Sequence, residues 1–119
     1  MGMDVEQFLA RLQHRLGSTE SDVHLVLESV LVALSPLMPW PSVNRLASAL
    51  PAEWIRALRT DRFDDRGDRA LFEARLSAVS VCSDDATEVL RELSSHLDAR
   101  PRHALLVGLP SDLRATLAA

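Results

Sequence analysis

Two short landmarks occur twice in this chain, in the same order, and this repetition is the strongest constraint on its fold. The Phe-x-Ala-Arg-Leu pattern of residues 8–12 returns at residues 72–76. The Leu-Pro-small-acidic-apolar pattern of residues 50–54 returns at residues 109–113. Two matches in order, with the same apolar periodicity between them, predict a duplicated unit whose second copy is shorter.

Apolar residues recur every three or four positions in both copies, which is the spacing of one face of an α-helix. The first helix and its counterpart carry Val5, Phe8, Leu9, Leu12 and Leu16, and then Phe72, Leu76 and Val79. The second helix and its counterpart carry Val23, Leu27, Val30 and Leu34, and then Ala86, Leu90, Leu93 and Leu97. The chain lacks Tyr and has only 4% aromatic residues, so Leu, Val and Ala must build the core.

Caps and prolines divide this periodic sequence into short helices. Gly17 is placed to end the first helix, with Ser18 or Thr19 as the cap of the second. The second copy's corresponding helix begins through Ser83 or Asp84.

A third helix, capped by Ser42, follows a proline-rich turn, and Pro51 and Pro110 stand where a last helix can begin in each copy. We therefore predict an all-α fold, a compact bundle of about eight short helices from two tandem diverged four-helix repeats. The first repeat covers residues 4–60, a charged linker covers 61–68, and the second repeat covers 69–119, all packed as one globular domain.

The second helix of the first copy is apolar on nearly every side, unlike its counterpart. Its additional apolar residues are Leu25, Val26, Leu31, Val32 and Ala33. Such a helix must be covered all round. It is therefore either central and packed by both copies, or part of a homodimer contact.

Two tryptophans receive different interpretations. Trp54 occupies the position of Leu113 in the repeat, which indicates a core residue. Trp40, between Pro39 and Pro41, is a better candidate for a surface anchor. The possible interface residues are Trp40, Leu25, Val26 and Val32.

The two landmarks together resemble a bacterial two-repeat helical family known as domain of unknown function 2267. The matching residues are Phe8, Arg11, Leu12, Leu50, Pro51 and Trp54 in the first copy, and Phe72, Arg75, Leu76, Leu109, Pro110 and Leu113 in the second. The resemblance extends over residues 4–117 and implies an all-α fold. It implies no activity and brings no catalytic residues.

Metal binding is the first chemistry to test, because carboxylates and histidines recur at helical spacing. The two groups are Glu20, His24 and Glu28, and Glu88, Glu92 and His96. Metal sites in helical bundles use inward-facing Glu-x-x-His pairs, and neither group has that spacing. We interpret both as solvated polar stripes and expect no metal. The linker resembles a calcium loop, but Arg62 and Arg66 fall at ligand positions and exclude it.

Cys82, the single cysteine, indicates a reducing compartment and lies just before a predicted helix. Its neighbours Val79 and Val81 suggest a small buried side chain, with a reactive thiol as the alternative. The chain has no nucleophile elbow and no glycine-rich phosphate loop. We therefore predict no enzyme, no catalytic residues and no cofactor.

Charge and hydropathy exclude further classes. All 13 basic residues are arginines, interspersed with 17 acidic residues for a net charge of −4, so nucleic acid is not an expected ligand. The longest apolar stretch, residues 30–40, is broken by prolines, and the N-terminus has no secretory pattern. We expect a cytoplasmic protein that makes no membrane contact.

These exclusions favour a non-enzymatic protein-interaction or regulatory module that binds a protein partner or itself. The alternative is a small-ligand or metal-binding carrier, with an apolar pocket between the copies lined by histidines. The alternative predicts a cavity of several hundred Å³ with convergent polar groups.

Overall fold

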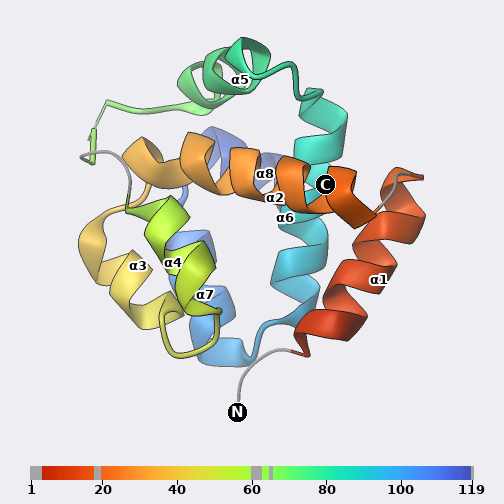
Figure 1. The fold of residues 1–119 in the computed structure, drawn as a ribbon. Helices are drawn as coiled ribbons and strands as arrows, with labels where there is room; N and C mark the ends of the chain where they lie inside the picture. The colour runs from red at the N-terminus through yellow and green to blue at the C-terminus, as the bar shows by residue number, and fades with distance from the viewer. Residues whose placement is uncertain (1–3, 18–19, 60–62, 65, 119) are drawn as a thin grey trace.

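Leu, Val and Ala side chains from all parts of the chain form one core in the computed structural model. The structure describes residues 4–17, 20–59, 63–64 and 66–118, whose helices are drawn in Figure 1. The helices are α1 (Val5–Leu16), α2 (Glu20–Leu34), α3 (Trp40–Leu46), α4 (Ala52–Leu58), α5 (Arg69–Ala78), α6 (Ser83–His96), α7 (Ala99–Gly108) and α8 (Ser111–Ala118), with a 3₁₀ turn, η1 (Ser35–Leu37), after α2. Within the described ranges there is no strand. The predicted all-α bundle of about eight short helices is confirmed.

Helix α1 shows how local sequence sets the element boundaries. The Asp4 carboxylate accepts a hydrogen bond of 3.2 Å from the Gln7 backbone N–H, which satisfies one free donor at the helix start. Gly17 ends the helix in the left-handed region, with φ of 64°, as predicted. Phe8 and Leu12 are fully buried, so the predicted face is the one that packs. Ser18 and Thr19, the expected caps of α2, lie outside the described residues.

One predicted helix start, the cap of α3 at Ser42, was wrong, whereas α6 begins at Ser83 as predicted. Ser42 does not cap α3, because the helix begins at Trp40 with Pro39 as its N-cap. Proline tolerates the first helical turn, where no N–H bond is needed, so α3 begins earlier and Ser42 lies buried inside it. Helix α6 begins at Ser83, with Cys82 in the capping position and no side-chain cap bond.

The linker is tied to the first half before α5 begins. The Asp64 backbone N–H donates to the Pro36 carbonyl at 2.7 Å. The Asp68 carboxylate then accepts from the Leu71 N–H at 3.1 Å and caps α5. Residues 61, 62 and 65 of the predicted linker lie outside the described residues, as do the boundary residues 60 and 119.

Helix α2 runs through the middle of the molecule, with α5 along one side of it (Figure 1). Helices α1 and α4 of the first half contact it, and so do α5 and α6 of the second. The expectation that both halves pack on this helix is confirmed. One stripe of α2 stays uncovered, however, since Leu25 is 64% exposed.

The contacts between the halves follow a reciprocal pattern. Helix α1 packs on α6 and α2 packs on α5, while α3 packs on α7 and α2 on α6. If α1 to α4 correspond to α5 to α8, a two-fold rotation that swaps the halves turns the α1–α6 contact into the α5–α2 contact. The same rotation turns the α3–α7 contact and the α2–α6 contact into themselves. A duplicated unit would produce this pairing, and the duplication itself stays a prediction.

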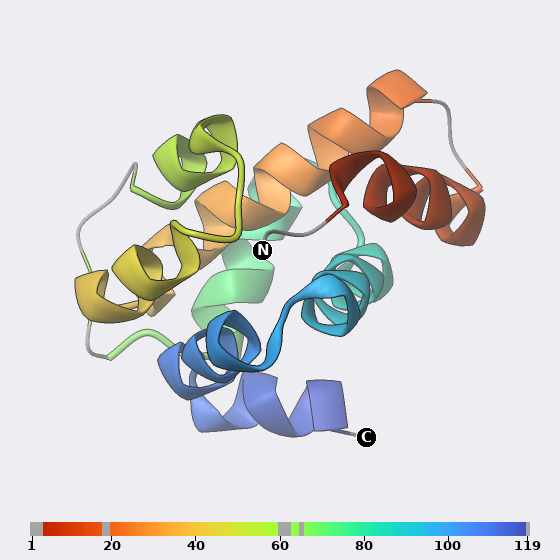
Figure 2. The same ribbon diagram turned by 90° about the horizontal axis from the view of Figure 1, so that it is seen from below.

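Helices α3 and α7 approach each other closely at a glycine. A Cβ atom placed on Gly108 would lie 2.8 Å from Ser42 Cβ and 3.0 Å from Met38 Cε. The contact with Ser42 Cβ leaves no room for a methyl group without movement of α3, whereas the flexible end of the Met38 side chain can give way. The close approach joins the two halves at their third helices, on the side seen in Figure 2. None of the described helices is both long enough and apolar enough to cross a membrane.

Candidate functional site

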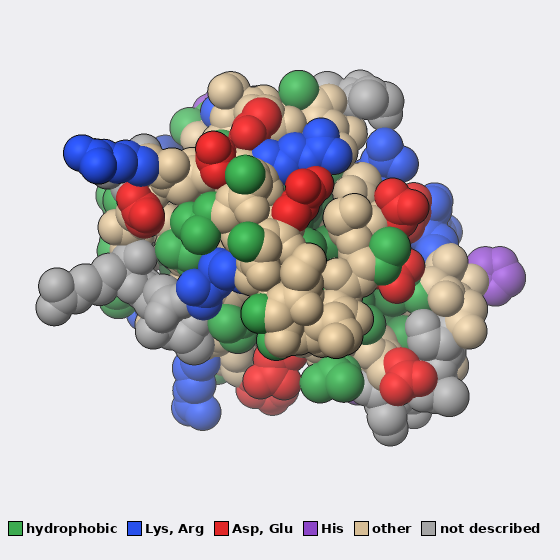
Figure 3. All heavy atoms as spheres, turned by 90° about the horizontal axis from the view of Figure 1, so that it is seen from above, with side chains coloured by type: hydrophobic (Ala, Val, Ile, Leu, Met, Phe, Trp, Pro, Cys, Tyr) green, Lys and Arg blue, Asp and Glu red, His purple; other side chains and the backbone are tan. Residues whose placement is uncertain are grey.

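An apolar groove runs between α2 and α5 and is called the α2–α5 groove below. Its volume is about 520 Å³, and its lining residues are Leu25, Glu28, Ser29, Val32, Ala33, Arg75, Ala78 and Val79. Leu25 on α2 is 64% exposed, and Val79, just after α5, is 55% exposed. Figure 3 shows the side of the molecule that carries α5, where hydrophobic side chains lie among acidic and basic ones. Large exposed apolar side chains next to one another are a mark of interaction surfaces.

The α2 side of this groove is a stripe along one helix face. Leu25, Ser29 and Val32 are four and three residues apart, which brings them to the same side of the helix. Ser29 lies in the middle of the stripe and is small. A second helix could therefore approach α2 closely at this point.

The structure separates the four residues predicted as an interface. Leu25 and Val32 lie together in the α2–α5 groove. Val26 does not line the groove and, like Val32, is half-buried against the core. Trp40 is 50% exposed at the start of α3, where the Arg59 guanidinium lies 5.2 Å from its ring centroid. Trp54, in contrast, is buried as predicted, with its ring centroid 5.4 Å from that of Phe8.

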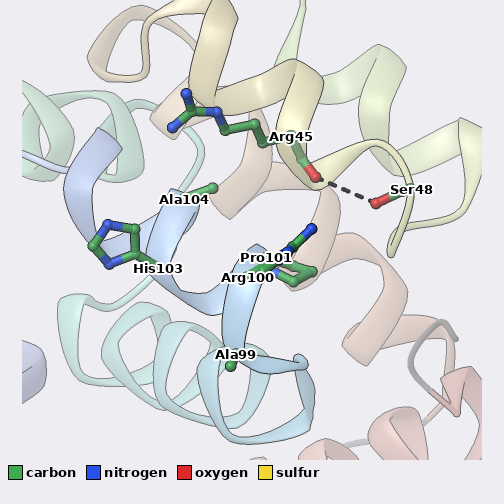
Figure 4. A pocket seen from close by; sticks show the side chains of 7 residues that line it. All are labelled: Arg45, Ser48, Ala99, Arg100, Pro101, His103 and Ala104. Carbon is green, nitrogen blue, oxygen red and sulfur yellow. Dashed lines mark hydrogen bonds between the residues drawn. The ribbon is translucent and has the colours of Figure 1, made fainter.

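A second concave region, called the α3–α7 pocket below, lies between the third helices of the two halves (Figure 4). Its volume is about 500 Å³, and its lining residues are Arg45, Ser48, Ala99, Arg100, Pro101, His103 and Ala104. Pro101 and Ala104 are buried, whereas Arg45, Arg100 and His103 are exposed. The pocket therefore has an apolar base and a basic rim. It lies between the third helices of the two halves, and its lining includes His103, one of the four histidines of the chain.

Glu92, His96 and Arg15 form a polar cluster between α6 and α1. The Glu92 side chain is only 5% exposed and pairs with the Arg15 guanidinium. Arg15 also contacts Glu88 at 3.0 Å. Nε2 of His96, a side chain 11% exposed, lies 3.2 Å from Glu92 Oε2.

The prediction of a solvated stripe at Glu88, Glu92 and His96 was therefore wrong. Helix α1 packs on α6 and covers Glu92, and the His96 ring meets the Phe8 ring edge-on at 5.6 Å. Burial of a carboxylate requires such partners, because an unpaired buried charge is strongly unfavourable. The first stripe differs, since His24 and Glu28 are both exposed. Among the residues that the structure describes, no group of three or more His, Cys, Asp or Glu side chains could hold a metal ion.

Cys82 is exposed, so the expectation of a small buried side chain was wrong. Its place at the start of α6 leaves the thiol outside the core that Ala86 and Leu90 enter. His96 lies at the other end of this helix of 14 residues, about 20 Å away at 1.5 Å per residue. Cys82 and His96 therefore do not form a nucleophile and base pair.

Comparison of the chain with protein-family models gave no match, and comparison with curated proteins gave none. The resemblance to domain of unknown function 2267 stays a prediction.

Proposed function

We propose that this chain is a non-enzymatic cytoplasmic interaction module that pairs with a second copy of itself through the α2–α5 groove. The observation that carries the proposal is the exposure of Leu25 and Val79, at 64% and 55%, on opposite sides of one groove. Removing apolar area from water stabilises a contact by about 25 cal/mol per Å². Covering this groove therefore supplies a driving force for association.

A second copy is favoured because the groove is self-complementary in charge. Glu28 lines it from α2 and Arg75 lines it from α5. In a two-fold contact, the same surface patch is used by both copies. Glu28 of each copy can then face Arg75 of the other, which fixes the orientation of the pair.

The α2 stripe is also self-complementary in shape. Two antiparallel α2 helices related by a two-fold axis would cross at Ser29, the small residue in the middle. Leu25 of one copy would then lie against Val32 of the other. Ala33 and Ala78, which also line the groove, leave space for these larger side chains.

The test compares Leu25→Glu with Val107→Glu. Val107 is 52% exposed on α7 and does not line the groove, so it controls for adding a charge to an exposed apolar site. We expect the native protein and Val107→Glu to show twice the chain mass of 13.1 kDa by light scattering. Leu25→Glu should show the single-chain mass with unchanged circular dichroism, because its charge would lie in the contact.

Single-chain mass of the native protein at every accessible concentration would contradict self-association. Equal dissociation by both variants would contradict the α2–α5 groove as its location. Capture of a different protein by the native chain, lost in Leu25→Glu and retained in Val107→Glu, would replace the second copy with that partner.

A further inference from the structure

We infer that the α3–α7 pocket binds a small organic anion, a carboxylate carried on an apolar body, independently of the self-association proposed above. The inference rests on a basic rim above an apolar base, at a boundary between the two halves of the chain (Figure 4).

The rim of the pocket carries positive charge only. The protein has a net charge of −4, yet Arg45, Arg100 and His103 line the pocket and no acidic side chain does. No ion pair joins Arg45 or Arg100 to another residue in the described part of the chain. Arg45 and Arg100 therefore leave positive charge at the rim, which an anion in the pocket would balance.

Arginine is also the side chain best suited to a carboxylate. Its planar fork of N–H donors matches the two oxygens of a carboxylate and forms short charge-assisted hydrogen bonds. Figure 4 shows the Arg45 side chain extending from α3 above Ala104, and Arg100 beside Pro101 on α7.

The base of the pocket indicates that the anion must carry an apolar group. Ala99, Pro101 and Ala104 line the base of the pocket, and Ala99 is the exposed one of the three. An ion pair with exposed arginines alone contributes at most about 1 kcal/mol. Useful affinity therefore needs apolar contact as well, and the volume of about 500 Å³ is within the usual range for small-molecule sites.

Arg102 on α7 and Arg114 on α8 have a structural role instead. Arg102 donates to the Ser94 and Leu97 carbonyls, both at 2.8 Å. Arg114 donates to the Leu109 carbonyl at 3.1 Å. These contacts satisfy carbonyls at the ends of α6 and α7, whereas Arg45 and Arg100 have no comparable side-chain contact among those given for the described residues.

The test is a nuclear magnetic resonance titration of the full chain with benzoate, benzamide and inorganic phosphate. Benzamide has the shape of benzoate without its charge, and phosphate has charge without an apolar body. We expect benzoate to bind most tightly and to shift the resonances of Arg45, Arg100 and Ala104.

Arg45→Gln and Arg100→Gln should each weaken benzoate binding about fivefold, the effect of one exposed ion pair. The control is Arg56→Gln, which removes an exposed charge that does not line the pocket and should change affinity by less than about twofold. Equal binding of benzamide would overturn the role of the arginines. Phosphate binding as tight as benzoate binding would overturn the role of the apolar base. A loss of benzoate affinity in Arg56→Gln as large as in the pocket variants would show only a general attraction between charges.

Discussion

Arg15 is the residue whose replacement tests the buried polar cluster most sharply. Its guanidinium pairs with Glu92, a carboxylate only 5% exposed, while the Arg15 side chain itself is 53% exposed. Arg15→Met keeps the aliphatic part of the side chain and removes the charge. Glu92 then stays buried with His96 as its remaining neighbour.

The structure sets the expected size of the effect. Removing one partner of a fully buried ion pair lowers the unfolding free energy by about 3–5 kcal/mol. Water reaches the exposed half of Arg15 and screens the pair, so we expect a loss of about 1–2 kcal/mol. For a chain of this length, that corresponds to a fall of about 4–8 °C in melting temperature.

Urea unfolding followed by circular dichroism measures this loss, with Arg11→Met as the matched control. Arg11 is on the same helix, is exposed, and should change stability by less than about 0.5 kcal/mol. Adding Glu92→Gln to Arg15→Met should restore most of the stability, because no charge is then left buried. The reasoning is refuted if both arginine variants lose the same stability, or if the double variant is no more stable than Arg15→Met.

Two further predictions concern packing and exposure. Gly108→Ala should lower the unfolding free energy by about 1–3 kcal/mol, because its Cβ would lie 2.8 Å from Ser42 Cβ; thermal unfolding that matches the native protein would contradict the close approach of α3 and α7. The exposed Cys82 thiol should react with a disulfide reagent within about tenfold of its rate in urea, since folding neither buries it nor places His96 beside it. Slow labelling of the folded protein that becomes fast in urea would show that folding covers Cys82.

The helices could be predicted from sequence because their signals are local. Apolar spacing identified the buried face of α1, and Gly17 identified its end. The comparison of Trp54 with Leu113 correctly indicated two core positions, which are 7% and 4% exposed. Prolines were less informative, since they tolerate several positions in a first turn, and α3 therefore began before the expected cap.

The burial of Glu92 depends on a neighbour distant in sequence, so helical periodicity alone could not decide it. The missed signal is Val89, which is buried and shares a helix face with Glu92 and His96 through its spacing of three and seven residues. It widens the apolar stripe of α6 towards the carboxylate. The α3–α7 pocket is harder still to predict, because Arg45 and Arg100 line one pocket only through the packing of α3 on α7.

The most direct test of self-association through α2 is an isotope-filtered nuclear Overhauser measurement on a mixture of labelled and unlabelled chains. It detects only contacts between copies. We predict signals between the Leu25 methyl groups of one copy and the Val32 methyl groups of the other, on either side of Ser29. A sample of single-chain mass, or a dimer whose contacts between copies exclude Leu25 and Val32, would contradict this account.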